Sequence, residues 1–415
     1  AVDLFELLLG DTNWAQKAAC SLDESNRWPA AIDLAAEWRI LPKLRAGLEL
    51  LGRLDELDSR DQLSEQLAAA TAHSIWAVHE GKSILRALRS EGVPHCAFKG
   101  IALVAGLYRR PALRTVGDLD LLVEPACLDK ARALLAEKGY TSPAPHFSAM
   151  VRSLDRSGTL DAADLSDREL LSATLRGQMN LSNLCLTLVN AAGFEVDVHW
   201  SIGTQPPECM SASAIIGRAE TADLLGVDVT AASPVDAILL TTHHAVRAAM
   251  APLSTVKDLC DLSRWMGELP VGRWSFARVA EAAHQARLQV PLCALWIILA
   301  SVDPQPALTD GIGVIRSQLS EGERRQAATL TRWFYQQLAG SRLNPDVMDL
   351  FQSPRKVGRM LADRVRGAGR EREALHTPLP SKPWLSRAYL IARELARPRR
   401  LAGYRAVVRA HNRYR

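Results

Sequence analysis

The chain has 415 residues and a formal net charge of +4, with 48% hydrophobic and 23% charged residues. This length allows two or three domains, and the composition excludes a wholly disordered, collagen-like or coiled-coil protein. The longest apolar run, residues 290–300, is shorter than the roughly 18–20 residues that span a membrane. Seven scattered cysteines without a Cys-x-x-Cys pair favour reduced thiols. We therefore expect a cytoplasmic protein with no transmembrane segment.

The charge is unevenly distributed along the chain. Residues 355–415 carry 17 Lys and Arg against 4 Asp and Glu, a net charge of +13, so the rest of the chain carries −9. A basic segment on an acidic body predicts an anionic partner, such as nucleic acid, lipid headgroups or an acidic peptide. The alternative is that these arginines lie on solvated helix faces. Apolar residues near helical spacing in 384–395 also allow this segment to pack on the body.

The first 90 residues predict helices. Residues 62–88 contain no Pro and one Gly, and their apolar residues recur at helical spacing. Ser59 fits a cap before this run, and Gly92 ends it.

From residue 91 the pattern changes to alternating strands and helices. A short strand at 95–99 leads through Gly100 into a helix up to about Tyr108, and alternation predicts a second strand at 118–123. A helix at 128–138 follows. This β-α-β-α order predicts a small mixed sheet with helices on one side.

Residues 141–180 are polar and irregular, which predicts an insertion or a lid. A hairpin of strands at 183–189 and 194–200 follows, and then a strand at 227–230. The pattern Ser233-Pro234-Val235-Asp236 is that of a capping box. It precedes four predicted helices, at 234–250, 254–268, 275–288 and 291–301.

These elements predict an α+β fold, in which a small mixed β-sheet core has helical N-terminal and C-terminal regions. The expected divisions are an N-terminal helical region, a core with an insertion at about 141–180, a helical region that completes the cleft, and a helical basic C-terminal region. Their ranges are 1–90, 91–232, 233–302 and 303–415.

Acidic side chains follow two of the predicted strands. Because residues i and i+2 of a strand point to the same face, Asp118 and Asp120 project together, as do Glu195, Asp197 and His199. If the two strands are neighbours, three carboxylates converge, and without a cation they repel one another. Carboxylates are hard oxygen ligands that suit Mg²⁺. The alternative for the Asp-x-Asp strand is a solvated face.

The residues around the first acidic strand can bind phosphate. Gly100 stands at a strand-to-helix junction, where the backbone can come close to a phosphate. Lys99 and Arg114 are cations that can offset the charge of a triphosphate. His199 can contact phosphate or assist proton transfer, or be only a polar neighbour. Phosphoryl or nucleotidyl transfer uses such a set, with two metal ions roughly 3.5–4 Å apart.

The order Lys-Gly, Arg, Asp-Leu-Asp and then Val-Asp-Val-His-Trp resembles the nucleotidyltransferases of the DNA polymerase β superfamily. It is most similar to a bacterial "nucleotidyltransferase family protein" group, in which Lys-Gly replaces the usual Gly-Ser. The resemblance spans about residues 5–300, with a later helix that contains Lys257-Asp258-Leu259. It implies that the sheet is a nucleotidyltransferase core.

The resemblance also implies roles for the residues. Asp118 and Asp120 would hold two Mg²⁺ ions, for which Mn²⁺ can substitute. Asp197 would hold the catalytic ion and help to deprotonate an acceptor hydroxyl. The residues expected to bind the nucleotide are Lys99, Gly100, Arg114 and His199. One position departs from the superfamily: Ile101 stands where the usual Ser contacts the triphosphate, so either Lys99 replaces that contact or phosphate binding is weak.

The implied substrates are an NTP, with ATP as the first choice, and a hydroxyl-bearing peptide or small molecule, as in the tailoring of natural products. Two alternatives stay open. The same scaffold can pass a phosphoryl or sugar group from a nucleotide donor, and Ile101 can mark a non-catalytic protein that binds a nucleotide or a partner.

Overall fold

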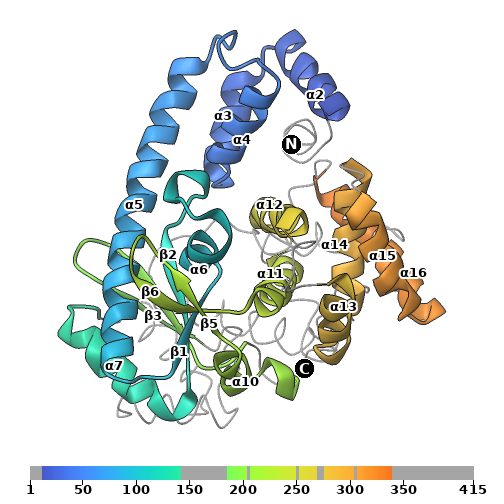
Figure 1. Ribbon diagram of the computed structural model, residues 1–415. Coiled ribbons are helices and arrows are strands. Elements are labelled where there is room, and N and C mark those ends of the chain that lie inside the picture. Colours follow the sequence, from blue (N-terminus) through green and yellow to red (C-terminus); the bar gives the residue numbers. More distant parts are fainter. Residues whose placement is uncertain are drawn as a thin grey trace, which may run out of the picture.

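The computed structural model describes residues 12–141, 185–202, 206–248, 252–268, 275–302 and 306–338. In this part of the chain a mixed β-sheet is surrounded by helices (Figure 1), so the predicted α+β fold class is confirmed. The predicted insertion beyond Thr141 and the basic segment 355–415 lie outside the described residues. No helix in the described ranges is both long and apolar enough to cross a membrane.

The sheet has six strands in the order β3-β4-β2-β1-β6-β5. Their bounds are β1 His95–Phe98, β2 Asp118–Val123, β3 Cys185–Val189, β4 Glu195–His199, β5 Glu220–Asp223 and β6 Asp228–Ala231. Strand β2 is antiparallel to β1 and parallel to β4, and β1 is parallel to β6. The antiparallel pairs β3–β4 and β5–β6 form the two edges. Strand β5 was not predicted, because its sequence is polar and mostly exposed.

Helices cover both faces of the sheet, so the expectation of helices on one side is wrong. Leu119 and Leu121 pack on one face with the helices α5 (Arg60–Ser90) and α7 (Leu128–Glu137). Phe98 and Leu122 point to the other face and belong to a core with the helices α11 (Pro234–Ala248) and α12 (Pro252–Glu268). The physical reason is that the central strands are buried on both sides, a pattern that a simple in–out alternation does not describe.

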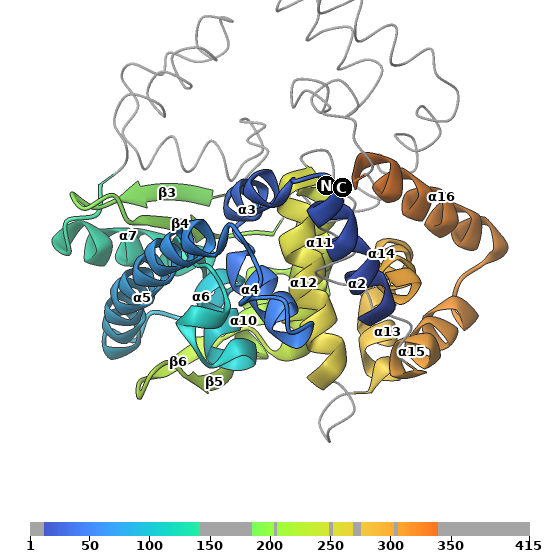
Figure 2. The same ribbon diagram turned by 90° about the horizontal axis from the view of Figure 1, so that it is seen from above.

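Within the described residues, the region before α5 is helical, as the sequence predicts, with α2 Thr12–Glu24, α3 Trp28–Glu37 and α4 Leu41–Leu50. Ile32, Leu44 and Leu48 are fully buried and join the core that contains α12. Figures 1 and 2 both show α4 between α5 and α12. The N-terminal helices therefore lie on the same side of the sheet as α12.

The chain after the sheet is helical. Ser233 caps α11: its Oγ accepts from the backbone N–H of Asp236 over 3.3 Å, which is the first half of the predicted capping box, and donates to the Asp236 carboxylate over 2.6 Å. Further along the chain, Trp296 is fully buried in α14 (Gln289–Val302), a helix that is apolar on all sides and is enclosed by its neighbours. The remaining long helices are α13 Phe276–Gln285, α14 Gln289–Val302, α15 Pro306–Ser317 and α16 Glu321–Leu338. In both ribbon views they lie beyond α11 and α12, away from α5.

Candidate active site

The acidic strands β2 and β4 are parallel neighbours. Their register puts Asp120 opposite Asp197 and Asp118 opposite Glu195. Side chains at paired positions of adjacent strands share a face. The convergence of the three aspartates required that their two strands are neighbours, and the structure meets this condition. The acids face the side on which α11 and α12 pack.

Asp120 is the most deeply buried of these aspartates. The Nζ of Lys99 donates to its Oδ1 over 3.0 Å, and the Nε2 of His199 lies 3.3 Å from the same oxygen without forming an aligned hydrogen bond. Burial by itself raises the pKa of Asp120, but the Lys99 ammonium and His199 outweigh burial and hold that pKa well below its usual range. Asp120 is therefore ionised and already paired with a cation.

Asp197 is in the opposite electrostatic situation. Burial raises the pKa of its carboxyl, and the charges of Asp120 and Asp118 raise it further. The hydroxyl of Thr187 on β3 donates to Asp197 Oδ1 over 2.5 Å and lowers the pKa, but the net shift is upward. The upward shift therefore comes first from burial, with the neighbouring aspartates adding to it against Thr187 and His199.

The backbone of Lys99 is strained. Its φ of +55° and ψ of −137° lie in a region that favours glycine, and a side chain there costs about 1–3 kcal/mol. Burial lowers the pKa of its ammonium, while Asp120, Asp258 and Asp118 raise it, with a net upward shift. Strain of this kind clusters at functional sites, and here it directs a charged ammonium toward Asp120.

Gly100 follows Lys99 and lies close to β2. A Cβ at this position would lie 3.3 Å from the backbone oxygen of Asp118, which is tighter than an ordinary contact. The next residue, Ile101, is fully buried, and its Cδ1 would lie 2.2 Å from a Cβ at Gly81 of α5. Position 101 thus packs against α5 rather than presenting a side chain to the acidic face.

Arg114 forms a buried, two-pronged ion pair with Asp261 of α12. Its Nε and Nη2 donate to the two carboxylate oxygens over 2.9 and 2.8 Å, and the hydroxyl of Tyr108 donates to Asp261 Oδ1 over 2.8 Å. The third nitrogen, Nη1, is buried without a hydrogen-bond partner and lies 3.9 Å from the Cβ position of Gly100. One donor of Arg114 is therefore still available beside the Lys-Gly turn.

Helix α12 brings further charges to the acidic face of the sheet, and the sequence analysis did not assign them to the site. Lys257 is half-buried, and burial and Arg114 lower its pKa to about 8, against the opposing effect of Asp118. Asp258 is buried and bonded to His244 over 2.8 Å. Lys257 and Asp261 could be taken for a weak i, i+4 helix pair, but Asp261 pairs with Arg114.

The N-terminal helices add one more cation. Arg39 follows α3 with a φ of +57°, and its Nη1 lies 3.1 Å from the Cβ position of Gly117, the residue before Asp118. It also contributes to lowering the pKa of Lys257. No local sequence pattern predicts a role for Arg39, because only the tertiary packing of α3 brings it close to the start of β2.

The structure therefore brings the predicted site residues together. Lys99, His199, Asp118 and Asp197 all act on Asp120 or lie beside it, while Gly100 and Arg114 adjoin the same turn. Thr187 also belongs to the site, because it lies opposite Asp197 on the neighbouring strand and donates to its carboxylate. The predicted hairpin of the two strands is the sequence signal that could have found it.

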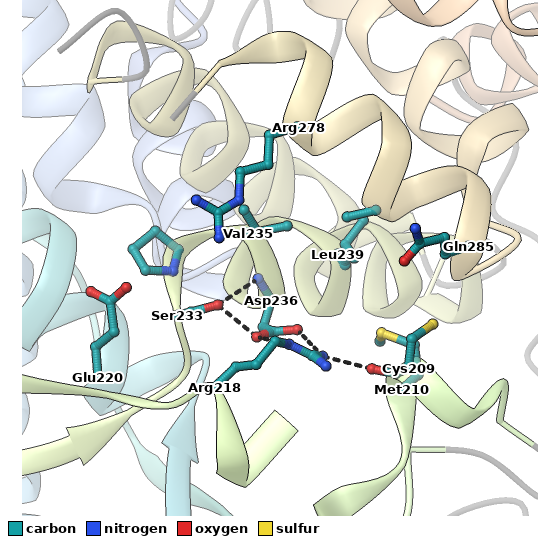
Figure 3. A pocket seen from close by; sticks show the side chains of 12 residues that line it. Cys209, Met210, Arg218, Glu220, Ser233, Val235, Asp236, Leu239, Arg278 and Gln285 are labelled. Carbon is teal, nitrogen blue, oxygen red and sulfur yellow. Dashed lines mark hydrogen bonds and ion pairs between the residues drawn. The ribbon is translucent and has the colours of Figure 1, made fainter. Parts of the chain in front are cut away.

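A separate cavity of about 690 Å³ lies where α10 (Ala212–Gly217) and β5 meet α11 and α13. Figure 3 shows Asp236 between Ser233 and Arg218, with Arg278 on another wall. Arg218 Nη2 donates to Asp236 Oδ1 over 2.7 Å and to the backbone oxygen of Cys209 over 2.6 Å. None of the predicted site residues lines this cavity.

Residues 24–302 match the sequence pattern of a family described as uncharacterised nucleotidyltransferase. The chain belongs to this nucleotidyltransferase family. The match contains both acidic strands, the Lys-Gly turn and helix α12, so the resemblance is confirmed at the level of the family, and the protein is a transferase of nucleotidyl groups. No curated protein and no solved structure matches the chain.

The strain at Lys99 predicts different stabilities for two substitutions. Lys99→Gly and Lys99→Ala both remove the ammonium, but only glycine fits the backbone. We expect Lys99→Gly to be more stable than Lys99→Ala by about 1–2 kcal/mol, measured by urea unfolding. Equal stabilities would show that the backbone of residue 99 is not strained.

The pKa of Asp120 is lowered and that of Asp197 is raised, so replacing each by Asn should have opposite effects on the stability of the metal-free protein. Asp120→Asn leaves the Lys99 ammonium unpaired and should lower the free energy of unfolding by about 3 kcal/mol or more. Asp197→Asn removes a carboxylate whose ionised form is unfavourable, and should equal or exceed the wild type at pH 7.

The pH dependence of unfolding checks these signs. The contribution of Asp120, whose pKa is lowered on folding, is present above about pH 4 and is lost at lower pH. The penalty from Asp197, whose pKa is raised, grows as the pH rises through its folded-state pKa, so the advantage of Asp197→Asn should vanish below about pH 4. A gap that widens at low pH would contradict the direction of the Asp197 shift.

Proposed function

We propose that this nucleotidyltransferase moves an NMP from an NTP to a hydroxyl acceptor, with Asp118, Asp120 and Asp197 as the catalytic carboxylates. The observation that supports this most is the parallel β2–β4 register, which sets Asp120 opposite Asp197 beside Asp118. The reaction forms a bond between the acceptor oxygen and the α-phosphorus and releases pyrophosphate, while the hydroxyl proton leaves to a base.

The three carboxylates fit a hard divalent cation. Their oxygens are the donors that Mg²⁺ prefers, and the charges of Asp120 and Asp118 add to the upward shift that burial gives the pKa of Asp197. Asp118 and Asp120 would hold two ions and Asp197 the catalytic one, with Mn²⁺ as a substitute. When bound, Mg²⁺ offsets the charge of the carboxylates and of the triphosphate.

Two groups of side chains have separate tasks in this proposal. Asp197, which would also hold the catalytic ion, receives the proton of the acceptor hydroxyl. Most groups proposed for the triphosphate lie on the β1 side of Asp120, where Gly100 allows close approach and Arg114 Nη1 is free to donate. His199 is on β4, the strand of Asp197. The proposed nucleotide-binding residues are Lys99, Gly100, Arg114 and His199.

The finer assignments follow the resemblance of the sequence. We place the chain in the bacterial Lys-Gly group, with ATP as the first choice of nucleotide and a peptide or small molecule of natural product biosynthesis as the acceptor. We also propose a cytoplasmic protein whose basic segment 355–415 binds an anionic partner. The divisions at residues 90, 232 and 302 remain predictions.

The direct experiment offers labelled ATP, GTP, CTP and UTP with Mg²⁺ and a panel of hydroxyl acceptors, and follows the products by intact mass. We expect an acceptor that gains the mass of an NMP, and no transfer by Asp118→Asn. Because Asp118, unlike Asp120, forms no ion pair with any of the described residues, its amide variant should keep the fold. A gain of phosphate or hexose would contradict the proposal in favour of the related transfer reactions.

The two cations missed by sequence reasoning predict an effect on triphosphate binding. Lys257→Met and Arg39→Gln should each weaken NTP binding roughly tenfold, the equivalent of about 1.4 kcal/mol, because each removes a positive charge beside Asp118. The affinity for the corresponding NMP should change little. Isothermal titration with both nucleotides measures this.

Arg45→Gln is the matched control, since Arg45 lies in α4 and pairs with Glu49 at the surface. If Arg45→Gln weakens NTP binding as much as Arg39→Gln, the effect is one of overall charge and the assignment of Arg39 to the cleft is wrong.

A further inference from the structure

A second set of possible metal ligands lies on the β3–β4 hairpin. Cys185 on β3 is opposite His199 on β4, and Asp197 is two residues before His199 on the same face. One donor atom from each of Cys185, Asp197 and His199 lies within 4.8 Å of the other two. Donors bound to one tetrahedral zinc ion are roughly 3.5 Å apart, so small side-chain rotations suffice to gather them.

One of these ligands is already oriented by a neighbour, and another has a buried nitrogen without a hydrogen bond. Thr187 donates to Asp197 Oδ1 over 2.5 Å, which fixes that carboxylate and leaves its other oxygen. The Nε2 of His199 lies 3.3 Å from Asp120 Oδ1, is buried and has no aligned hydrogen bond. A hydrogen bond that holds a ligating carboxylate in this way is typical of the surroundings of metal sites.

The chemistry of this set differs from that of the aspartate cluster. A thiolate, an imidazole and a carboxylate suit Zn²⁺, whereas Mg²⁺ prefers oxygen ligands alone. Three protein ligands leave the fourth position of the ion to water. Binding requires the Cys185 thiol to lose its proton to solvent, and no redox step is involved.

We propose that Cys185, Asp197 and His199 form a binding site for Zn²⁺ or a similar thiophilic divalent cation. Because Asp197 belongs to both sets, occupancy of this site withdraws a ligand from the aspartate cluster and stops transfer. Only this inhibitory consequence rests on the proposed function; binding of the ion does not.

Co²⁺ is the spectroscopic probe for binding. Titration of the full chain with Co²⁺ should produce the near-ultraviolet charge-transfer band of a cobalt thiolate, at one equivalent, and Zn²⁺ should abolish it. Cys185→Ser should lose the band and bind Zn²⁺ roughly 100-fold or more weakly. Cys20→Ser, at an exposed position of α2, is the control and should behave as the wild type. Thermal melts without metal verify that both variants are folded.

A wild-type titration without the band, or an equal band in Cys185→Ser, would overturn the site. Inhibition is measured separately, in saturating Mg²⁺ with an active acceptor. Zn²⁺ should inhibit the wild type and Cys20→Ser at concentrations that leave Cys185→Ser active. Equal inhibition of all three proteins would refute the competition, while the Co²⁺ spectra would still decide the binding site whatever group the enzyme transfers.

Discussion

The register between β2 and β4 is the constraint on which the charged cluster depends. The period of a strand is two residues, so a slip by one residue would turn one set of aspartates toward α5 and α7 and the leucines toward α11 and α12. The register is held from both sides, because β2 also pairs with β1, with Asp120 opposite Phe98. The apolar residues that alternate with the acids therefore position the acids.

The ion pair between Arg114 and Asp261 connects this sheet to the helices. It joins the segment before β2 to α12, and both side chains are almost fully buried, at 5% and 2% exposure. Removing one partner of such a pair leaves an unpaired buried charge, which costs far more than the pair itself contributes. Since Lys257 and Asp258 are on the same helix as Asp261, their placement beside the aspartates depends on this contact.

The charged side chains beside the aspartates fall into two groups, which differ in whether the protein itself supplies a partner of opposite charge. Asp120 and Asp261 have cationic partners in the protein, and their environment is complete without a substrate. Asp197 and Lys257 are shifted toward their neutral forms, first because burial disfavours their charges and further because like charges lie nearby. A cation beside Asp197 and a polyanion beside Lys257 would stabilise the charged form of each side chain.

Local patterns were enough to predict the strand with Asp118 and Asp120, the helix that begins at Pro234 and the grouping of the three aspartates. Each depends on alternation or on a cap within a few residues. The position of Arg39, the true partner of Asp261 and the helices on the second face of the sheet could not be predicted, because they depend on contacts between distant segments. Strand β5 was missed for a different reason: it is an exposed edge whose polar sequence resembles a loop.

The turn that follows Gly100 has a consequence for the length of the chain. After α6 (Gly100–Leu103), residues Val104–Tyr108 form a π turn, closed by the bond from the N–H of Arg109 to the oxygen of Val104 over 2.7 Å. A π turn holds one residue more than an α turn, which changes the angular phase of the next side chain by about 100°. This phase turns the hydroxyl of Tyr108 toward Asp261. Loss of a single residue here would restore the α-helical phase and rotate the tyrosine away, so the number of residues in this segment is constrained as well as their identity.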